Sequence, residues 1–172
     1  MIYKEPTFKF LKDIKMESNF SKAVKFTLLA EGIISDDPKD TGGLTVFGIS
    51  SKWFPDKCKQ LHKLVLEGKI EVARDLAIEF YKVEYWKKAG CDVLTNNNRE
   101  QLAICVFDTA VNCGVRMAKS FLLESYDWVY YLMQRVVYNT TCKTEATHLR
   151  GWTRRIARLY NYVSKMQPYI DY

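Results

Sequence analysis

The spacing of apolar residues predicts a mainly helical chain. From Asn19 to about Ala30, Phe20, Val24 and Leu28 fall on one arc of a helix, with Ala23 beside it. Ser18 precedes this segment and suits an N-cap. The same spacing predicts further helices over residues 56–67, 69–86, 99–113, 116–138 and 146–166. Glycines near the expected boundaries are Gly68, Gly90, Gly114 and Gly151.

Two of these helices carry long apolar stripes, which predict core-facing sides. The stripe of the helix over 69–86 consists of Val72, Leu76, Phe80 and Val83. The stripe of the last helix consists of Trp152, Ile156, Leu159 and Val163. Stripes of this kind indicate packing rather than a cofactor site.

The segment from Gly32 to Ser50 breaks the helical pattern. Turn-forming residues occur at Asp36-Asp37-Pro38 and at Gly42-Gly43, with short β-prone pieces on either side. We therefore predict a mainly α fold with a small β-hairpin lobe and a helical body.

Composition indicates one globular domain without a recognised linker. The chain has 172 residues, 48% of them hydrophobic and 14% aromatic. A soft boundary is expected near Thr95-Asn96-Asn97-Asn98. The net charge is +6, but the basic residues are spread along the chain, which favours a solvated surface over a nucleic-acid site. A basic nucleic-acid binder is a third alternative, for which the sequence contains no recognised motif.

The cysteine pattern does not indicate a disulfide framework or a zinc site. The five cysteines form no C-x-x-C pair and accompany only two histidines, so neither a disulfide framework nor a zinc site is indicated. We expect free thiols, no metal and no cofactor. The N-terminal residues have no apolar run of signal-peptide length, and no stretch reaches the length of a membrane span.

One carboxylate stands out by position. Glu31 ends the first helix on its inward face, where apolar surroundings would favour a protonated acid. Asp40 and Thr45 follow in the loop, and a returning hairpin would place them opposite the helix end. Such a set suits glycoside hydrolysis, in which Glu31 would be the general acid and Asp40 and Thr45 would position the attacking water. The alternatives are a solvated glutamate and an ordinary Asp-rich turn or calcium loop.

The later helices hold a second polar group. Asp108 and Asn112 are four residues apart on one helix and can share a face. A structural polar brace is favoured over a sugar contact for this pair. Four tryptophans are candidates for stacking on sugar rings, although helical aromatics are more often core residues. They are Trp53, Trp86, Trp128 and Trp152.

Several blocks of the sequence resemble the glycoside hydrolase family 108 muramidases. Residues 30–50 are similar to the family pattern E-G-G-Y, a short spacer, D-P-x-D-P-G-G-x-T and G-I-[ST]. Tyr85-Trp86 and the segment from Phe107 to Gly114 resemble the family's later region, and Gly151-Trp152-Thr153-Arg154-Arg155 resembles its closing G-W-x-x-R. The chain differs from the family pattern at three positions. It has Ile33 where the family more often has a second glycine, Thr41 where proline is common, and Phe47 where tyrosine is frequent.

The resemblance implies a lysozyme-like α+β fold with the cleft between the lobe and the helical body. Glu31 matches the catalytic glutamate, and the order Glu31, Asp40, Thr45 is similar to that of some phage lysozymes. The implied substrate contacts are Asp37, Gly43, Phe47 and Asn112. The implied organisation is an N-terminal extension over 1–17, a muramidase catalytic region over 18–95, and a peptidoglycan-binding-like helical region over 96–172 packed on it as one compact unit.

The function expected from this resemblance is N-acetylmuramidase activity, which cleaves the β-1,4 bond between N-acetylmuramic acid and N-acetylglucosamine. The expected partners are peptidoglycan strands and, for export, a holin, with no nucleic acid, no membrane insertion and a monomeric state. We expect synthesis in the bacterial cytoplasm without a signal peptide and action at the cell wall, as for prophage endolysins or proteins labelled secretion activators. The alternative is a muramidase-fold module with little turnover that binds peptidoglycan or a protein.

Overall fold

The computed structural model describes residues 18–35, 43–124, 126–142 and 145–166, apart from the side chains of 29–31 and 145–147. Within these residues the chain is mostly helical, with one small sheet, which confirms the predicted fold class. The elements in chain order are α1 (Asn19–Glu31), β1 (Ile34–Ser35), β2 (Thr45–Val46), β3 (Ile49–Ser50), α2 (Pro55–Leu66), α3 (Ile70–Tyr81), the π-helical turn η2 (Lys82–Lys87), α4 (Cys91–Asn96), α5 (Glu100–Cys113), α6 (Val115–Phe121), α7 (Trp128–Thr140) and α8 (Glu145–Val163).

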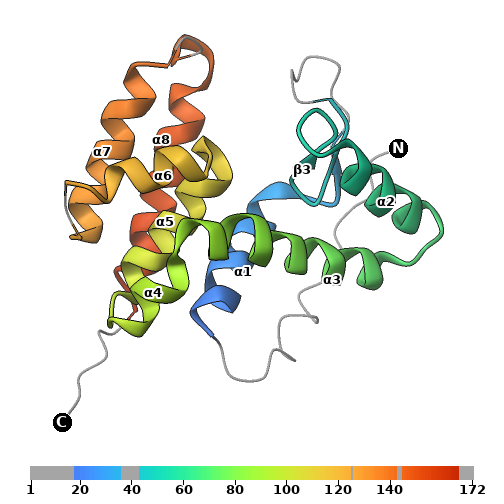
Figure 1. Cartoon of the computed structure of the whole chain (residues 1–172). Helices are drawn as coiled ribbons and strands as arrows, with labels where there is room; N and C mark the ends of the chain where they lie inside the picture. Colours follow the sequence, from blue (N-terminus) through green and yellow to red (C-terminus); the bar gives the residue numbers. More distant parts are fainter. Residues whose placement is uncertain (1–17, 36–42, 125, 143–144, 167–172) are drawn as a thin grey trace.

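Helix α5 is the centre of the helical body. It packs against α1, α4, α6, α7, α8 and η2, whereas α2 and α3 form a pair beside the sheet (Figure 1). Every residue from Leu102 to Ala110 is buried, as expected for a helix covered on all sides. Phe107 of α5 packs edge-on against Phe20 of α1 and also contacts Trp86. These contacts fix the first helix on the body.

The sheet is an antiparallel meander in the order β1-β2-β3. Ile34 pairs with Val46, and Val46 in turn pairs with Ile49. The β2–β3 turn consists of Phe47 and Gly48, which both have positive φ angles, 49° and 76°. Two successive residues of this kind make the type of tight turn that matches strand twist. The predicted lobe is therefore present, but this turn was not anticipated because phenylalanine rarely adopts a positive φ.

Most predicted helix boundaries are confirmed, and three expectations are wrong. The helix expected over 116–138 is two helices, because the chain breaks after Phe121 and Asp127 caps α7 by accepting a 2.7 Å hydrogen bond from the Tyr130 amide. Helix α4 was not predicted; it follows Gly90, which is left-handed. Gly151 lies inside α8 rather than at a boundary.

The predicted core stripe of α3 is also wrong in part. Val72 and Val83 are exposed, and Leu76 and Phe80 are half-buried. The fully buried residues are Ala73, Ala77 and Tyr81, one position further along the helix. Small side chains let a neighbouring element approach closely, so the alanine side of the helix faces inward. The other stripes are largely confirmed, since Val24, Ile156, Leu159 and Val163 are buried.

The described residues contain no group of three or more His, Cys, Asp or Glu side chains that could hold a metal ion. Nor does any helix among them combine the length and apolarity that a membrane crossing requires. All five cysteines are free thiols, as predicted; Cys58, Cys91 and Cys105 are buried, while Cys113 and Cys142 are half-buried.

Candidate functional site

Helix α1 ends at Glu31, at the centre of the molecule between the sheet and the helical body (Figure 1). Gly32 follows with a φ of 61°, which turns the chain out of the helix and into β1. The side chain of Glu31 lies outside the described part of the structure. Its position at a helix end is therefore as predicted from periodicity, and its catalytic role stays a prediction.

The loop that follows carries the other predicted residues. Asp37 and Asp40 lie outside the described residues, so their proposed roles stay predictions. Thr45 begins β2, where it pairs with Ser35 on one side and Ser50 on the other. Its hydroxyl donates a 3.3 Å hydrogen bond to the carbonyl of Gly43. The sheet therefore places Thr45 beside β1, the strand that begins three residues after Glu31.

Gly43 lies two residues before β2 and is the first described residue after the loop. Its φ is 67°, and a Cβ atom there would lie 3.1 Å from the Ser51 hydroxyl oxygen. The positive φ disfavours any side chain at this position. This requirement of the backbone accounts for a glycine here, and a substrate contact at Gly43 stays a prediction.

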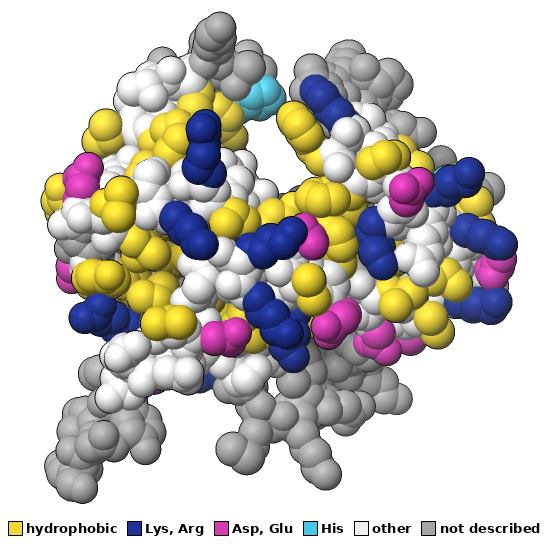
Figure 2. Space-filling view, viewed as in Figure 1, with side chains coloured by type: hydrophobic (Ala, Val, Ile, Leu, Met, Phe, Trp, Pro, Cys, Tyr) yellow, Lys and Arg dark blue, Asp and Glu magenta, His cyan; other side chains and the backbone are white. Residues whose placement is uncertain are grey.

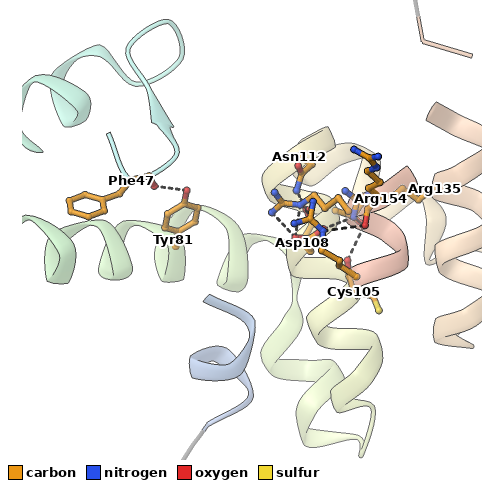
Figure 3. A network of polar contacts seen from close by, with 10 residues as sticks. Phe47, Tyr81, Cys105, Asp108, Asn112, Arg135 and Arg154 are labelled. Carbon is orange, nitrogen blue, oxygen red and sulfur yellow. Dashed lines mark hydrogen bonds and ion pairs between the residues drawn. The ribbon is translucent and has the colours of Figure 1, made fainter. Parts of the chain in front are cut away.

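Phe47 joins the lobe to α3. Its ring is only 3% exposed, and its amide donates a 2.8 Å hydrogen bond to the carbonyl of Ile33. The carbonyl of Phe47 accepts a 2.9 Å hydrogen bond from the hydroxyl of Tyr81, which is buried in α3 (Figure 3). Phe47 therefore has a structural role in holding the turn, and the sugar contact expected there stays a prediction. Burial raises the pKa of the neighbouring Tyr85 to about 12, so the Tyr85 phenol stays neutral near pH 7.

Replacing Tyr81 by phenylalanine should loosen this attachment. The substitution leaves the carbonyl of Phe47 buried without its phenolic donor, at a cost of about 1–3 kcal/mol in the free energy of unfolding. Urea denaturation measures the change. The matched control is Tyr160→Phe, which removes the hydroxyl of an exposed tyrosine on α8. Equal stability of the two variants would contradict the assigned role of Tyr81.

Asp108 lies at the centre of a buried ionic cluster. One carboxylate oxygen accepts a 2.6 Å hydrogen bond from Arg135 of α7 (Figure 3). The other accepts a 2.8 Å hydrogen bond from Arg155 of α8. Burial by itself raises the pKa of the Asp108 carboxyl, but the charges and hydrogen bonds of the two arginines more than offset this and hold the pKa below its ordinary value. The interpretation of Asp108 as a structural brace is confirmed, since it ties three helices together.

Asn112 stands one turn after Asp108 and donates a 2.6 Å hydrogen bond to its backbone carbonyl. It also lines a small pocket of about 150 Å³ between the ends of α5, α7 and α8. The other lining residues are Cys113, Arg135, Tyr138, Asn139, Cys142 and Trp152. The part played by Asn112 in substrate binding stays a prediction. Sequence reasoning missed the residues of α7 here because no local pattern links them to α5.

A second hollow lies at the surface of the molecule. Figure 2 shows a hollow between the side that carries α7 and α8 and the side that carries β3 and α2, with hydrophobic side chains at its bottom. Of the tryptophans considered for sugar stacking, Trp53 follows β3 and is 71% exposed, whereas Trp86 is buried and donates a 2.6 Å hydrogen bond to Asp92. Trp86 is therefore a core residue, whereas the indole of Trp53 is exposed, with the Lys52 ammonium 5.5 Å from its ring centroid.

Comparisons with known proteins agree with this architecture. A sequence model for the family described as Glycosyl hydrolase 108 matches residues 24–114. The solved structure of SagA from Brucella abortus is similar, with a TM-score of 0.66 and 22% sequence identity over 87% of this chain and 95% of that one. This likeness shows a shared fold. No curated protein matches the chain significantly.

Proposed function

The chain belongs to the glycosyl hydrolase 108 family and is a glycoside hydrolase module, and from this membership we propose that it is an N-acetylmuramidase. The proposed reaction is hydrolysis of the β-1,4 bond between N-acetylmuramic acid and N-acetylglucosamine in bacterial peptidoglycan. The observation that carries the proposal is the family match, which includes the end of α1, Glu31 and the whole sheet.

In the proposed mechanism, Glu31 protonates the oxygen that leaves with the departing sugar. A carboxyl group in the last turn of a helix lies at the negative end of the helix dipole, which disfavours its ionised form and helps to keep the proton. Asp40 and Thr45 orient the attacking water on the opposite side of the sugar ring. Metal chemistry has no part in this proposal.

The hollow between the lobe and the helical body is the proposed binding groove for the glycan strand (Figure 2). Its hydrophobic floor suits the faces of sugar rings, and Trp53 supplies an exposed indole at the lobe. Asp37, Gly43, Phe47 and Asn112 are the proposed substrate contacts. The proposed place of action is the bacterial cell wall, after synthesis in the cytoplasm and export through a holin in the manner of an endolysin.

Digestion of defined peptidoglycan tests the proposal directly. We expect mass analysis of the released fragments to show new reducing ends on N-acetylmuramic acid, because a muramidase cuts on that side of the disaccharide. New reducing ends on N-acetylglucosamine would overturn the proposed bond specificity. Binding to walls without any released fragment would instead indicate the alternative, a module that holds peptidoglycan without turnover.

A further inference from the structure

The outward side of α7 is an exposed apolar surface. Four of its side chains are large, hydrophobic and open to solvent: Val129 is 36% exposed, Tyr130 47%, Met133 50% and Val137 63%. At 100° per residue, these four fall within one continuous arc of about 100°. The opposite side of the helix, with Tyr131 and Leu132, is fully buried in the body. We call the four exposed residues the α7 face.

The four residues of the α7 face are uncharged, and Glu124 at the edge of this face accepts a 3.2 Å hydrogen bond from the Tyr130 hydroxyl. The single charged residue of the helix is Arg135, which is buried and paired with Asp108. An exposed helix side without a charged residue is unusual in a chain in which 27% of residues are charged and the net charge is +6. Exposed helix surfaces ordinarily carry charges, whereas the centres of protein interfaces lack them and are enriched in Tyr and Met. The composition of the α7 face is therefore that of an interface.

The spacing along the α7 face is symmetric about its middle. Val129, Met133 and Val137 are each four residues apart and form one ridge of three successive turns. If a second copy of the helix lies antiparallel, a two-fold axis at Met133 brings Val129 of one copy opposite Val137 of the other. A two-fold interface requires this reciprocity, in which the same patch serves both partners.

We propose that the α7 face is the interface of a homodimer, in place of the monomer expected from the sequence. Leu123, just before the helix, is 87% exposed and extends the open apolar surface beyond these four residues. Standard interfaces bury about 800 Å² per partner, so the α7 face would form the apolar centre of the interface and neighbouring residues would form its rim. Because the four residues are uncharged, two chains of net charge +6 bring no basic side chains together at the centre of this interface.

Other occupants fit less well. A glycan needs hydrogen-bonding side chains for its hydroxyl groups, and three of the four residues of the α7 face have none. An anionic membrane would be repelled by Glu124 and Asp127, which are exposed at the beginning of the helix. In an antiparallel pair, the acidic residues at the beginning of each helix lie beside the last turn of the other copy's helix, which has no charged side chain, so the two acidic ends do not meet.

A dimer built on this face leaves the proposed catalytic groove open. Helix α7 lies at one edge of the molecule, whereas α1 ends at the centre and the sheet lies on the far side (Figure 1). The proposal therefore does not depend on the proposed reaction, and it can hold for a catalytically inactive protein.

Analytical ultracentrifugation of the full chain over a wide concentration range tests the proposal. The wild type should approach twice its 20.1 kDa mass, and Met133→Asp should weaken the dimer by at least about tenfold, because a charge would be buried at the two-fold axis. The control is Val72→Asp, which places the same charge on an exposed valine of α3. It should leave the dimer intact. Circular dichroism establishes that each variant is folded, and Val137→Lys is a second variant with the same expectation.

Disulfide formation tests the antiparallel pairing of the two α7 helices about Met133. Met133→Cys should form a disulfide with its own counterpart across the axis under mild oxidation, whereas Val72→Cys should not, with wild type as the background for the native thiols. A wild-type protein that stays monomeric at every concentration would overturn the proposal, and so would a dimer that Met133→Asp leaves unchanged. A monomer in which Met133→Asp lowers binding to isolated walls would assign the face to glycan instead and equally reject the dimer.

Discussion

Replacing Glu31 by glutamine is expected to lower the rate of wall lysis by a factor of about 10²–10⁴, the usual contribution of general acid catalysis. Glutamine has nearly the same shape as glutamic acid but cannot donate an acidic proton to the leaving oxygen. Because position 31 is the last residue of α1, the substitution should leave helix and sheet in place. The decrease is measured as the loss of turbidity clearing with isolated walls.

The matched control for this experiment is Glu79→Gln on the exposed side of α3. It makes the same chemical change outside the proposed site and should retain full activity. Thermal unfolding should be closely similar for wild type and both variants. Unchanged lysis by the Glu31→Gln protein would exclude Glu31 as the acid, and an equal loss in both variants would point to a general effect of charge on wall binding.

The largest effect on stability is expected for Asp108→Asn. The substitution removes the negative partner of two arginines and leaves the buried Arg135 without charge compensation. Breaking a buried pair in this way costs about 3–5 kcal/mol. For a chain of this length the melting temperature should fall by on the order of 10 °C. Differential scanning calorimetry measures both quantities.

An exposed ion pair is the control for the buried Asp108 cluster. Glu71 pairs with Arg74 within α3, but the glutamate is 60% exposed, and exposed pairs contribute about 0–1 kcal/mol. Glu71→Gln should therefore change the melting temperature only slightly. Similar shifts for the Asp108 and Glu71 variants would show that the buried cluster is not a brace for α5, α7 and α8.

The effect of Asp108→Asn should also depend on pH. The folded-state pKa of Asp108 is depressed by its arginines, so its contribution is fully present above the pKa of the unfolded chain and is lost as pH falls through the lower folded-state value. The difference in unfolding free energy between wild type and variant should be constant near neutral pH. It should shrink below the ordinary pKa range of aspartate. Urea titrations at a series of pH values measure this difference, and a constant difference into strong acid would contradict the ionic origin of the stability.

Local patterns in the sequence determined much of the fold. The inward faces of α1 and α8 followed from apolar residues at helical spacing, since Val24, Ile156, Leu159 and Val163 are buried as predicted. Gly68, Gly90 and Gly114 mark real boundaries because each has a positive φ that glycine adopts without strain. The position of Glu31 at the end of a helix followed from the same periodicity. These features depend only on residues that are neighbours in the chain.

Other features were decided by tertiary structure alone. The inward side of α3 is set by Ala73 and Ala77, because close approach of the packed neighbours outweighs the larger valines. The partners of Asp108 are 27 and 47 residues away, a pairing that no local pattern contains. The left-handed conformation of Phe47 is likewise maintained by Tyr81, 34 residues later. The sequence by itself determined where helices form and where the candidate acid stands; the packing of helices decided which faces are buried, because burial depends on contacts between residues far apart in the chain.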